Sequence, residues 1–142
     1  MNILVLEDDP IAFSLIDYLT ELGYNVYHAQ SLLDVAYFLE ESPGLEFFDK
    51  LMFDVDVPKE KFSVFQNEEI EYGAEYGFSG FEFVEKNYKY LRHKNIALIT
   101  AYKITLFNKF REKNDREVLE KLTIIDKGSD DFIVELLSFL NS

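Results

Sequence analysis

The sequence predicts an α/β fold, a doubly wound parallel sheet, from two observations. Several short apolar runs lack the polar alternation of a half-exposed strand, which is typical of strands covered on both faces. Between these runs, apolar residues recur at helical spacing. Strands and helices therefore alternate along the chain, and this order predicts a five-stranded parallel sheet flanked by about five helices.

The strands are predicted from their aliphatic content. Four buried strands are expected at residues 3–6, 51–53, 96–99 and 122–125. A fifth run, at 25–29, is more polar, which is typical of an edge strand.

The helices are predicted from capping residues and apolar stripes. Asp9 can cap a first helix with Pro10 at its first position, and Gly23 is a natural stop. Ser31 begins a second helix that ends near Glu41. A third helix is expected from the capping box at Ser79–Glu82 through Leu91, and a fourth helix or pair of helices within 103–121. The last helix is expected after the cap Ser129, with Ile133, Leu137 and Leu140 facing inward.

Length and composition limit the functions that the chain can have. Its 142 residues, 48% of them hydrophobic, suit one compact domain with a real core. The net charge of −13 repels phosphate backbones and argues against nucleic-acid binding. No apolar run is long enough to cross a bilayer, and the absence of cysteine excludes disulfides and thiolate metal sites. We therefore expect a cytoplasmic domain with no nucleic-acid or membrane partner.

The single domain expected over residues 1–142 has one irregular feature. About twenty residues, 59–78, separate the third strand from its helix, where two to six are usual. Loops of this length are typically functional or mobile. The five aromatic residues in this insert argue against a fully solvated segment.

Charge is unevenly distributed. Residues 1–58 carry twelve acids and one base, whereas seven of the fourteen bases fall between Lys103 and Lys127. The base-rich part of the chain is therefore a candidate surface for a protein partner.

Polar residues follow each buried strand. Glu7 and Asp8 follow the first, Asp54 the third, Thr100 the fourth and Lys127 the fifth. Open parallel sheets bind ligands outside the carboxyl ends of their strands, where the winding direction reverses. If the first and third strands are neighbours, three carboxylates converge there and repel one another. A divalent cation would remove this repulsion, and ligands that are all oxygen favour Mg²⁺.

The same residues suit phosphoryl transfer. A carboxylate such as Asp54 can act as a nucleophile and form an aspartyl phosphate. The Lys127 ammonium and the Thr100 hydroxyl could each contact a phosphoryl oxygen, while Mg²⁺ neutralises the developing charge.

These motifs resemble the receiver domain of response regulators in two-component signalling, over nearly the whole chain. The resemblance implies a flavodoxin-like fold with strand order 2-1-3-4-5. It rests on four motifs in order, namely Leu4–Asp9, Leu51–Asp54 followed by Pro58, Ile99–Ala101 and Ile125–Lys127. The residue roles that it implies are Mg²⁺ ligation by Glu7, Asp8, Asp54 and the backbone carbonyl of Asp56, phosphoryl acceptance by Asp54, switching by Thr100 and phosphate contact by Lys127.

The resemblance also implies the function. The chain is expected to be a stand-alone receiver without an output domain, and no enzyme beyond self-phosphorylation and slow autodephosphorylation. The phosphoryl donor would be a sensor histidine kinase or a histidine phosphotransfer protein. A downstream protein would bind through 103–127, and homodimerisation is a further option.

Three departures from the receiver pattern leave alternatives open. Ser79-Gly80 stands where receivers have an earlier Asp-Gly pair, Gly128 replaces the usual proline, and Ile124 replaces the usual switching aromatic. A pseudo-receiver that binds partners without phosphorylation is one alternative. Another is a haloacid-dehalogenase-like phosphatase that uses Asp54 and Asp56, although that motif normally lies on the first strand and leaves Glu7-Asp8 unexplained.

Overall fold

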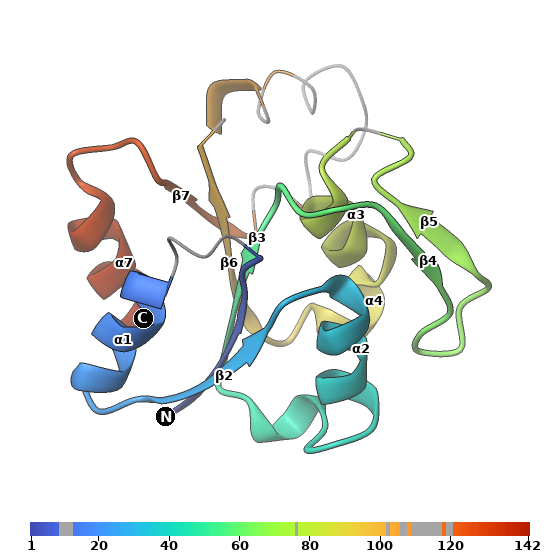
Figure 1. Ribbon diagram of the computed structural model, residues 1–142, viewed down its shortest axis with the longest axis horizontal. Coiled ribbons are helices and arrows are strands. Elements are labelled where there is room, and N and C mark those ends of the chain that lie inside the picture. The colour runs from blue at the N-terminus through green and yellow to red at the C-terminus, as the bar shows by residue number, and fades with distance from the viewer. Residues whose placement is uncertain (9–12, 76, 102, 106–107, 109–117, 119–120) are drawn as a thin grey trace.

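The computed structural model describes residues 1–8, 13–75, 77–101, 103–105, 108, 118 and 121–142. The chain folds as a five-stranded parallel sheet with helices on both faces (Figure 1). The strands in spatial order are β2 (Asn25–Ala29), β1 (Asn2–Leu6), β3 (Lys50–Asp54), β6 (Asn95–Thr100) and β7 (Thr123–Asp126). The expected fold class and the order 2-1-3-4-5 are therefore confirmed.

The helices form two layers. On one face lie α1 (Phe13–Glu21) and α7 (Phe132–Leu140), and on the other α2 (Leu32–Glu40), α3 (Ser79–Lys86) and α4 (Tyr88–Leu91) (Figure 1). A short 3₁₀ turn, η2 (Leu45–Phe47), precedes β3. The expected start of the first helix at Asp9 and Pro10, and most of 103–121, lie outside the described residues.

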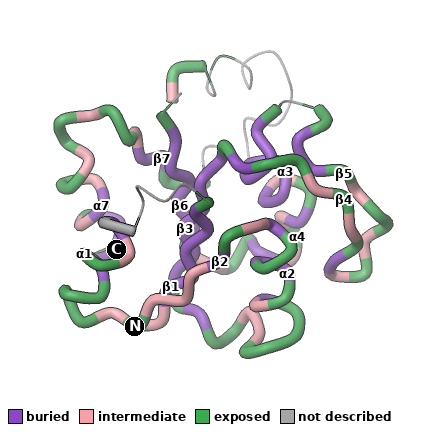
Figure 2. The backbone as a smooth tube through the Cα atoms, viewed as in Figure 1, coloured by how far each residue is buried: buried purple, intermediate pink, exposed green. Residues whose placement is uncertain are grey.

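The sheet is buried on both faces because its strands carry apolar side chains on both (Figure 2). Leu4 and Phe53 face the cluster formed with α2 and α3. Val5 and Met52 face the cluster formed with α1 and α7. This two-sided burial is the reason that the strands read as continuous apolar runs. No described helix is both long enough and apolar enough to cross a bilayer.

Several details of the helix predictions are wrong. Ser79 is the first residue of α3 and therefore does not cap it. Glu82 accepts a hydrogen bond from the Glu75 amide at 3.2 Å instead of closing a capping box. The expected helix 79–91 is divided into α3 and α4 at Asn87. Ile133 is 44% exposed, because α7 instead turns Leu136, Phe139 and Leu140 toward the sheet.

The predicted caps differ in outcome. Ser31 accepts a hydrogen bond from the Asp34 amide at 3.1 Å, which confirms it as the cap of α2. Ser129 does not cap α7, which begins three residues later at Phe132. Its hydroxyl accepts from the Asp131 amide and so stabilises the turn that leads into the helix.

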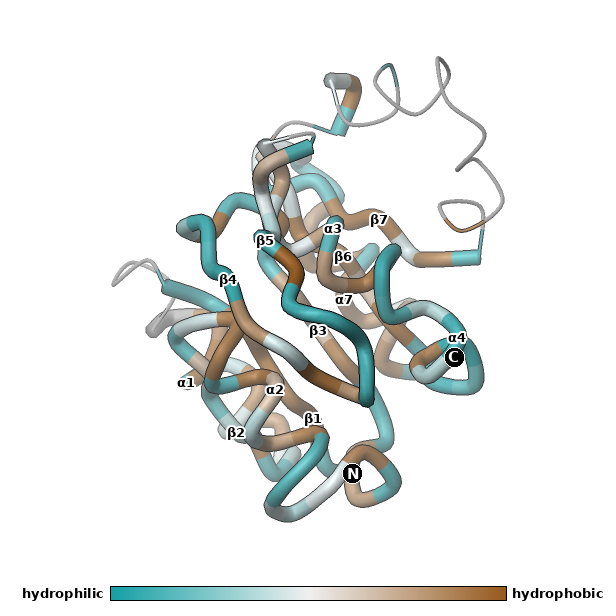
Figure 3. The backbone as a smooth tube through the Cα atoms, turned by 90° about the vertical axis from the view of Figure 1, so that its right-hand side faces the viewer, coloured by the Kyte–Doolittle hydropathy of each residue, from teal (hydrophilic) through white to brown (hydrophobic). Residues whose placement is uncertain are grey.

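The insert forms an antiparallel hairpin, β4 (Glu60–Phe62) and β5 (Ile70–Tyr72), on the α2–α3 side of the molecule (Figures 1 and 3). The rings of Phe62 and Tyr72 pack on Phe83 of α3 with centroids 6.3 and 5.3 Å away. Tyr72 is completely buried, and its hydroxyl accepts a hydrogen bond from Asn87 at 3.1 Å. The aromatic residues of the hairpin thus extend the core beyond α2 and α3.

Candidate functional site

Three acids meet at the carboxyl edge of the sheet. Glu7 and Asp8 directly follow β1, and Asp54 ends the neighbouring β3. One carboxylate oxygen from each lies within 4.8 Å of the others. Glu7 and Asp54 are only 2% and 4% exposed, whereas Asp8 is exposed. The parallel register of adjacent strands therefore brings together carboxylates that are 46 or 47 positions apart in the chain.

Lys127 supplies positive charge to this cluster. It follows β7, and its Nζ lies 2.6 Å from Asp54 Oδ2 and 3.4 Å from Glu7 Oε2. Burial alone would lower the pKa of Lys127, but its hydrogen bond and Coulomb attraction to Asp54, with a further contribution from Glu7, raise that pKa above the ordinary lysine value. The lysine is therefore held charged against two buried carboxylates.

Both oxygens of Asp54 have a partner. Oδ2 accepts from Lys127, and Oδ1 accepts a hydrogen bond from the backbone amide of Asp56 at 2.9 Å. The Asp56 side chain is exposed and does not belong to the group of three converging acids. The Asp54 carboxylate is thus held from two sides, by the Lys127 side chain and by the backbone of the loop that follows β3.

Thr100 ends β6, which lies between β3 and β7. It is completely buried, and its carbonyl accepts a hydrogen bond from the Lys127 amide at 3.0 Å. In the register of the sheet, Thr100 is opposite Asp126, and Ile99 is opposite Asp54. Thr100 and Lys127 therefore reach the same edge as the acids.

Two residues make contacts at the site that sequence reasoning did not assign to them. Gly80 donates its amide to the Val55 carbonyl at 3.1 Å, and a Cβ at this position would overlap the Asp54 carbonyl oxygen. His28 on β2 lies with Nε2 2.8 Å from the Glu7 carbonyl oxygen. A glycine at the start of a helix signals close backbone approach, but nothing in the sequence indicates which strand it approaches.

The donor set fits a hard divalent cation. Three carboxylates and one ammonium leave a formal charge of −2 at the cluster (−3 + 1 = −2). All side-chain donors are oxygens, which is the ligand type that Mg²⁺ prefers. The residues present are therefore compatible with the magnesium ion expected from the sequence.

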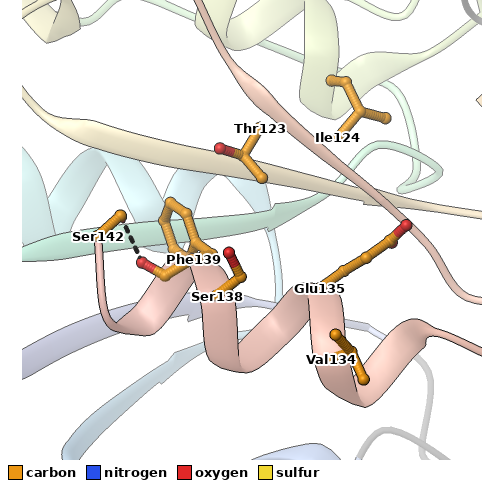
Figure 4. A pocket seen from close by; sticks show the side chains of 7 residues that line it. All are labelled: Thr123, Ile124, Val134, Glu135, Ser138, Phe139 and Ser142. Carbon is orange, nitrogen blue, oxygen red and sulfur yellow. Dashed lines mark hydrogen bonds between the residues drawn. The ribbon is translucent and has the colours of Figure 1, made fainter.

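A separate groove lies on the outer side of the sheet, between β7 and α7 (Figure 4). Its volume is about 360 Å³, and the Phe139 ring provides apolar surface, whereas the Ile124 side chain points to the other face of the sheet. The full lining is Thr123, Ile124, Val134, Glu135, Ser138, Phe139 and Ser142. Two of these residues, Thr123 and Ile124, belong to the segment 103–127 that the sequence indicates as a partner surface.

No model of a known protein family matches the sequence, and no curated protein matches it significantly. Solved structures do match. The receiver domain of the hybrid histidine kinase CckA is 21% identical, with 99% of this chain and 96% of that chain covered and a TM-score of 0.61. Chemotaxis protein CheY4 of Vibrio cholerae is 17% identical, with 99% and 95% covered and a TM-score of 0.63.

A third match is to the complex of the histidine kinase ThkA with the response regulator TrrA, at 22% identity, with 99% of this chain and 98% of that chain covered and a TM-score of 0.59. Identities at this level establish the fold and leave the roles of individual residues to other arguments. Many further similar structures are also receiver domains. Sheet order, helix layers and these comparisons agree that the chain has the CheY-like fold of response-regulator receiver domains.

Proposed function

We propose that this chain is a phosphoacceptor receiver, which takes a phosphoryl group on Asp54 in a Mg²⁺-dependent reaction and signals by phosphorylation-controlled binding of a partner. The observation that carries the proposal is the contact between Lys127 and Asp54 within a buried acidic cluster at the carboxyl edge of the sheet. The receiver fold supports it, because ligands of open parallel sheets bind at this edge.

In the proposed reaction, a carboxylate oxygen of Asp54 attacks the phosphorus of a phosphohistidine or of a small phosphodonor. A bond forms between the Asp54 oxygen and phosphorus while the bond from phosphorus to the leaving group breaks, and the leaving group keeps the electron pair. Lys127 then leaves the Asp54 oxygen that is bonded to phosphorus and contacts a phosphoryl oxygen, and the Thr100 hydroxyl is a candidate donor to another. In the slow hydrolysis that follows, water attacks the phosphorus, the bond from phosphorus to the Asp54 oxygen breaks, and inorganic phosphate leaves the restored carboxylate.

Electrostatics explain why a metal is required. The cluster already carries a formal charge of −2, and a phosphoryl group brings further negative charge to a buried position. Mg²⁺, when bound, would neutralise charge on the phosphoryl oxygens. Glu7, Asp8, Asp54 and the backbone carbonyl of Asp56 are the residues that we assign to hold it.

We assign a sensor histidine kinase or a histidine phosphotransfer protein, in the cytoplasm, as the donor. A kinase is present with a response regulator in one of the similar solved structures. For the downstream partner we assign the segment 103–127 together with the groove between β7 and α7, and a second copy of the chain is an alternative partner.

The test is intact-mass measurement after incubation with Mg²⁺ and acetyl phosphate. We expect the mass of one phosphoryl group to be added to the wild type, and to be absent with Asp54→Asn or when EDTA replaces Mg²⁺. No adduct on the wild type, or an undiminished adduct on Asp54→Asn, would contradict the proposal.

Asp56→Asn separates this proposal from the phosphatase alternative. The receiver mechanism needs only the backbone of Asp56, so this variant should still form the adduct. Multiple turnover of a phosphomonoester that is lost in Asp56→Asn would favour the phosphatase. A partner that binds Asp54→Ala as well as the wild type would favour a pseudo-receiver.

A further inference from the structure

The insert leaves and rejoins the domain at residues that pack closely against Gly73. We call Lys59, Gly73 and Ser79 the insert neck. Gly73 has φ +102°, and a Cβ at this position would overlap Ser79 Oγ and come within 2.8 Å of Lys59 Cγ. Ser79 is 1% exposed, and its hydroxyl has no hydrogen-bond partner among the described residues. The contact between Gly73 and Ser79 is therefore steric, and it leaves no space for a side chain at position 73.

The neck is joined directly to the phosphoacceptor strand. Gly80 follows Ser79, and a Cβ at Gly80 would overlap the Asp54 carbonyl oxygen and lie 2.9 Å from Val55 Cα. The Gly80 amide also donates to the Val55 carbonyl at 3.1 Å. Two close contacts, of Gly73 with Ser79 and of Gly80 with Asp54, thus connect the end of the hairpin to the backbone of Asp54.

The other end of this connection is anchored in the core. Tyr72 immediately precedes Gly73, is completely buried, and packs on Phe83 with ring centroids 5.3 Å apart. Phe83 in turn lies 6.2 Å from the ring of Phe53, the residue before Asp54. The hairpin therefore reaches the end of β3 both through the neck and through a series of packed rings.

We propose that the β4–β5 hairpin positions the phosphoacceptor, with Gly73, Ser79 and Gly80 as positioning residues. The start of α3 is fixed between the hairpin and Asp54, so a displacement of the hairpin moves the Asp54 backbone relative to Lys127 and the other acids. The insert then sets the rate at which Asp54 is phosphorylated. This rate effect rests on the function proposed above, whereas the packing connection does not.

The experiment compares variants of two glycines that have nearly the same φ. Gly73→Ala crowds Ser79, whereas Gly44→Ala has nearly the same φ, +99° against +102°, and open space around its Cβ. We expect Gly73→Ala to lower the rate of phosphorylation by acetyl phosphate about tenfold, because small displacements of a reacting group are costly. Gly44→Ala should keep the wild-type rate. Adding Ser79→Ala to Gly73→Ala removes the nearer crowding atom, which has no hydrogen bond to lose, and leaves only the flexible Lys59 side chain to move aside, so the rate should be restored.

The amide NMR signals of Asp54 and Val55, which are distant in sequence from all the substitutions, provide a second readout that does not depend on phosphorylation. They should shift in Gly73→Ala, return in the double variant and stay in place in Gly44→Ala. Equal rates for the two glycine variants, or a slow Gly73→Ala that Ser79→Ala does not restore, would overturn the inference. If the wild type forms no adduct, the proposed function fails, but the packing connection is still tested by the amide signals. Amide signals that do not shift in Gly73→Ala would overturn the packing connection. If Gly73→Ala does not fold, Ser79→Thr replaces it, because the threonine adds one methyl group to the insert neck. We expect Ser79→Thr to lower the phosphorylation rate and to shift the same amide signals.

Discussion

At the level of single residues, Lys127 explains how two carboxylates can be buried side by side. Glu7 and Asp54 are nearly inaccessible, and the lysine Nζ lies within 3.4 Å of an oxygen of each. Leaving a buried charge uncompensated is costly. The ammonium therefore stabilises the fold, and in the reaction proposed above the same position would let it contact the phosphoryl group on Asp54.

This contact predicts a pH dependence of stability. The folded-state pKa of Lys127 is raised above its unfolded value, because attraction to Asp54 and Glu7 exceeds the opposing effect of burial. The stabilisation is thus fully present below the unfolded pKa and is lost as the pH rises through the folded one, at about pH 10.5 and above. One third of the side chain is exposed, so solvent screening limits it to on the order of 1 kcal/mol. Urea unfolding from about pH 8 to about pH 11.5 should show a larger loss for the wild type than for Lys127→Met, and equal losses would contradict this account.

The acids and the lysine of the site could be predicted from sequence because each directly follows a buried strand. Once β1 and β3 are neighbours with Leu6 opposite Phe53, the next residues of the two strands, Glu7 and Asp54, reach the same edge of the sheet. Ser79 shows the limit of such reasoning. Its spacing to Glu82 has the form of a capping box, yet packing against Gly73 places its hydroxyl in a site with no partner, and this contact is invisible in local sequence.

At the level of elements, the hairpin caps the N-terminus of α2. Glu60 Oε1 accepts from the Leu32 amide at 2.7 Å and Oε2 from the Leu33 amide at 3.3 Å, beside the cap supplied by Ser31. A carboxylate at a helix N-terminus satisfies free amides and interacts favourably with the helix dipole. The insert thereby supplies part of the N-terminal capping of a helix that precedes it in the chain.

Glu60→Gln tests the contribution of this capping carboxylate. The amide side chain keeps the shape and one acceptor but loses the charge and the second acceptor, so we expect the free energy of unfolding to fall by about 0.5–1 kcal/mol. Glu68→Gln, at an exposed position of the same insert, is the matched control and should change little. Chemical denaturation measures both. A loss for Glu68→Gln as large as that for Glu60→Gln would show that general charge, and not the helix contact, is responsible.

The hairpin itself could not be predicted from sequence. Its strands have three residues each, fewer than a period-two pattern needs to be recognised. Its stability comes from contacts distant in the chain, such as Tyr72 with Asn87 and Glu60 with Leu32. The aromatic content of 59–78 indicated only that the segment would not be fully solvated. By contrast, the long apolar strands were predicted to within one or two residues.

At the level of the whole molecule, the insert is continuous with the hydrophobic core. Val64 and Tyr72 belong to the same buried cluster as Leu51 and Phe53 of β3. Asn87 donates to the Tyr72 hydroxyl and the Phe83 carbonyl and accepts from Asn67, so its polar atoms are satisfied jointly by the insert and α3. An insert that completes the core in this way should unfold together with the sheet.

Tyr72→Ala therefore tests whether the chain is one cooperative unit. Removing a fully buried ring should cost about 3–5 kcal/mol of global stability, and Tyr37→Ala, at a position 57% exposed on α2, should cost much less. Far-UV and near-UV circular dichroism should report one coincident urea transition for the wild type and for both variants, since the hairpin and the sheet share a core. A separate early transition in the near-UV signal would mean that the hairpin unfolds on its own. Stability would then be lost locally, the Asp54 edge of the sheet would stay folded, and the positioning role of the insert would lose its structural basis.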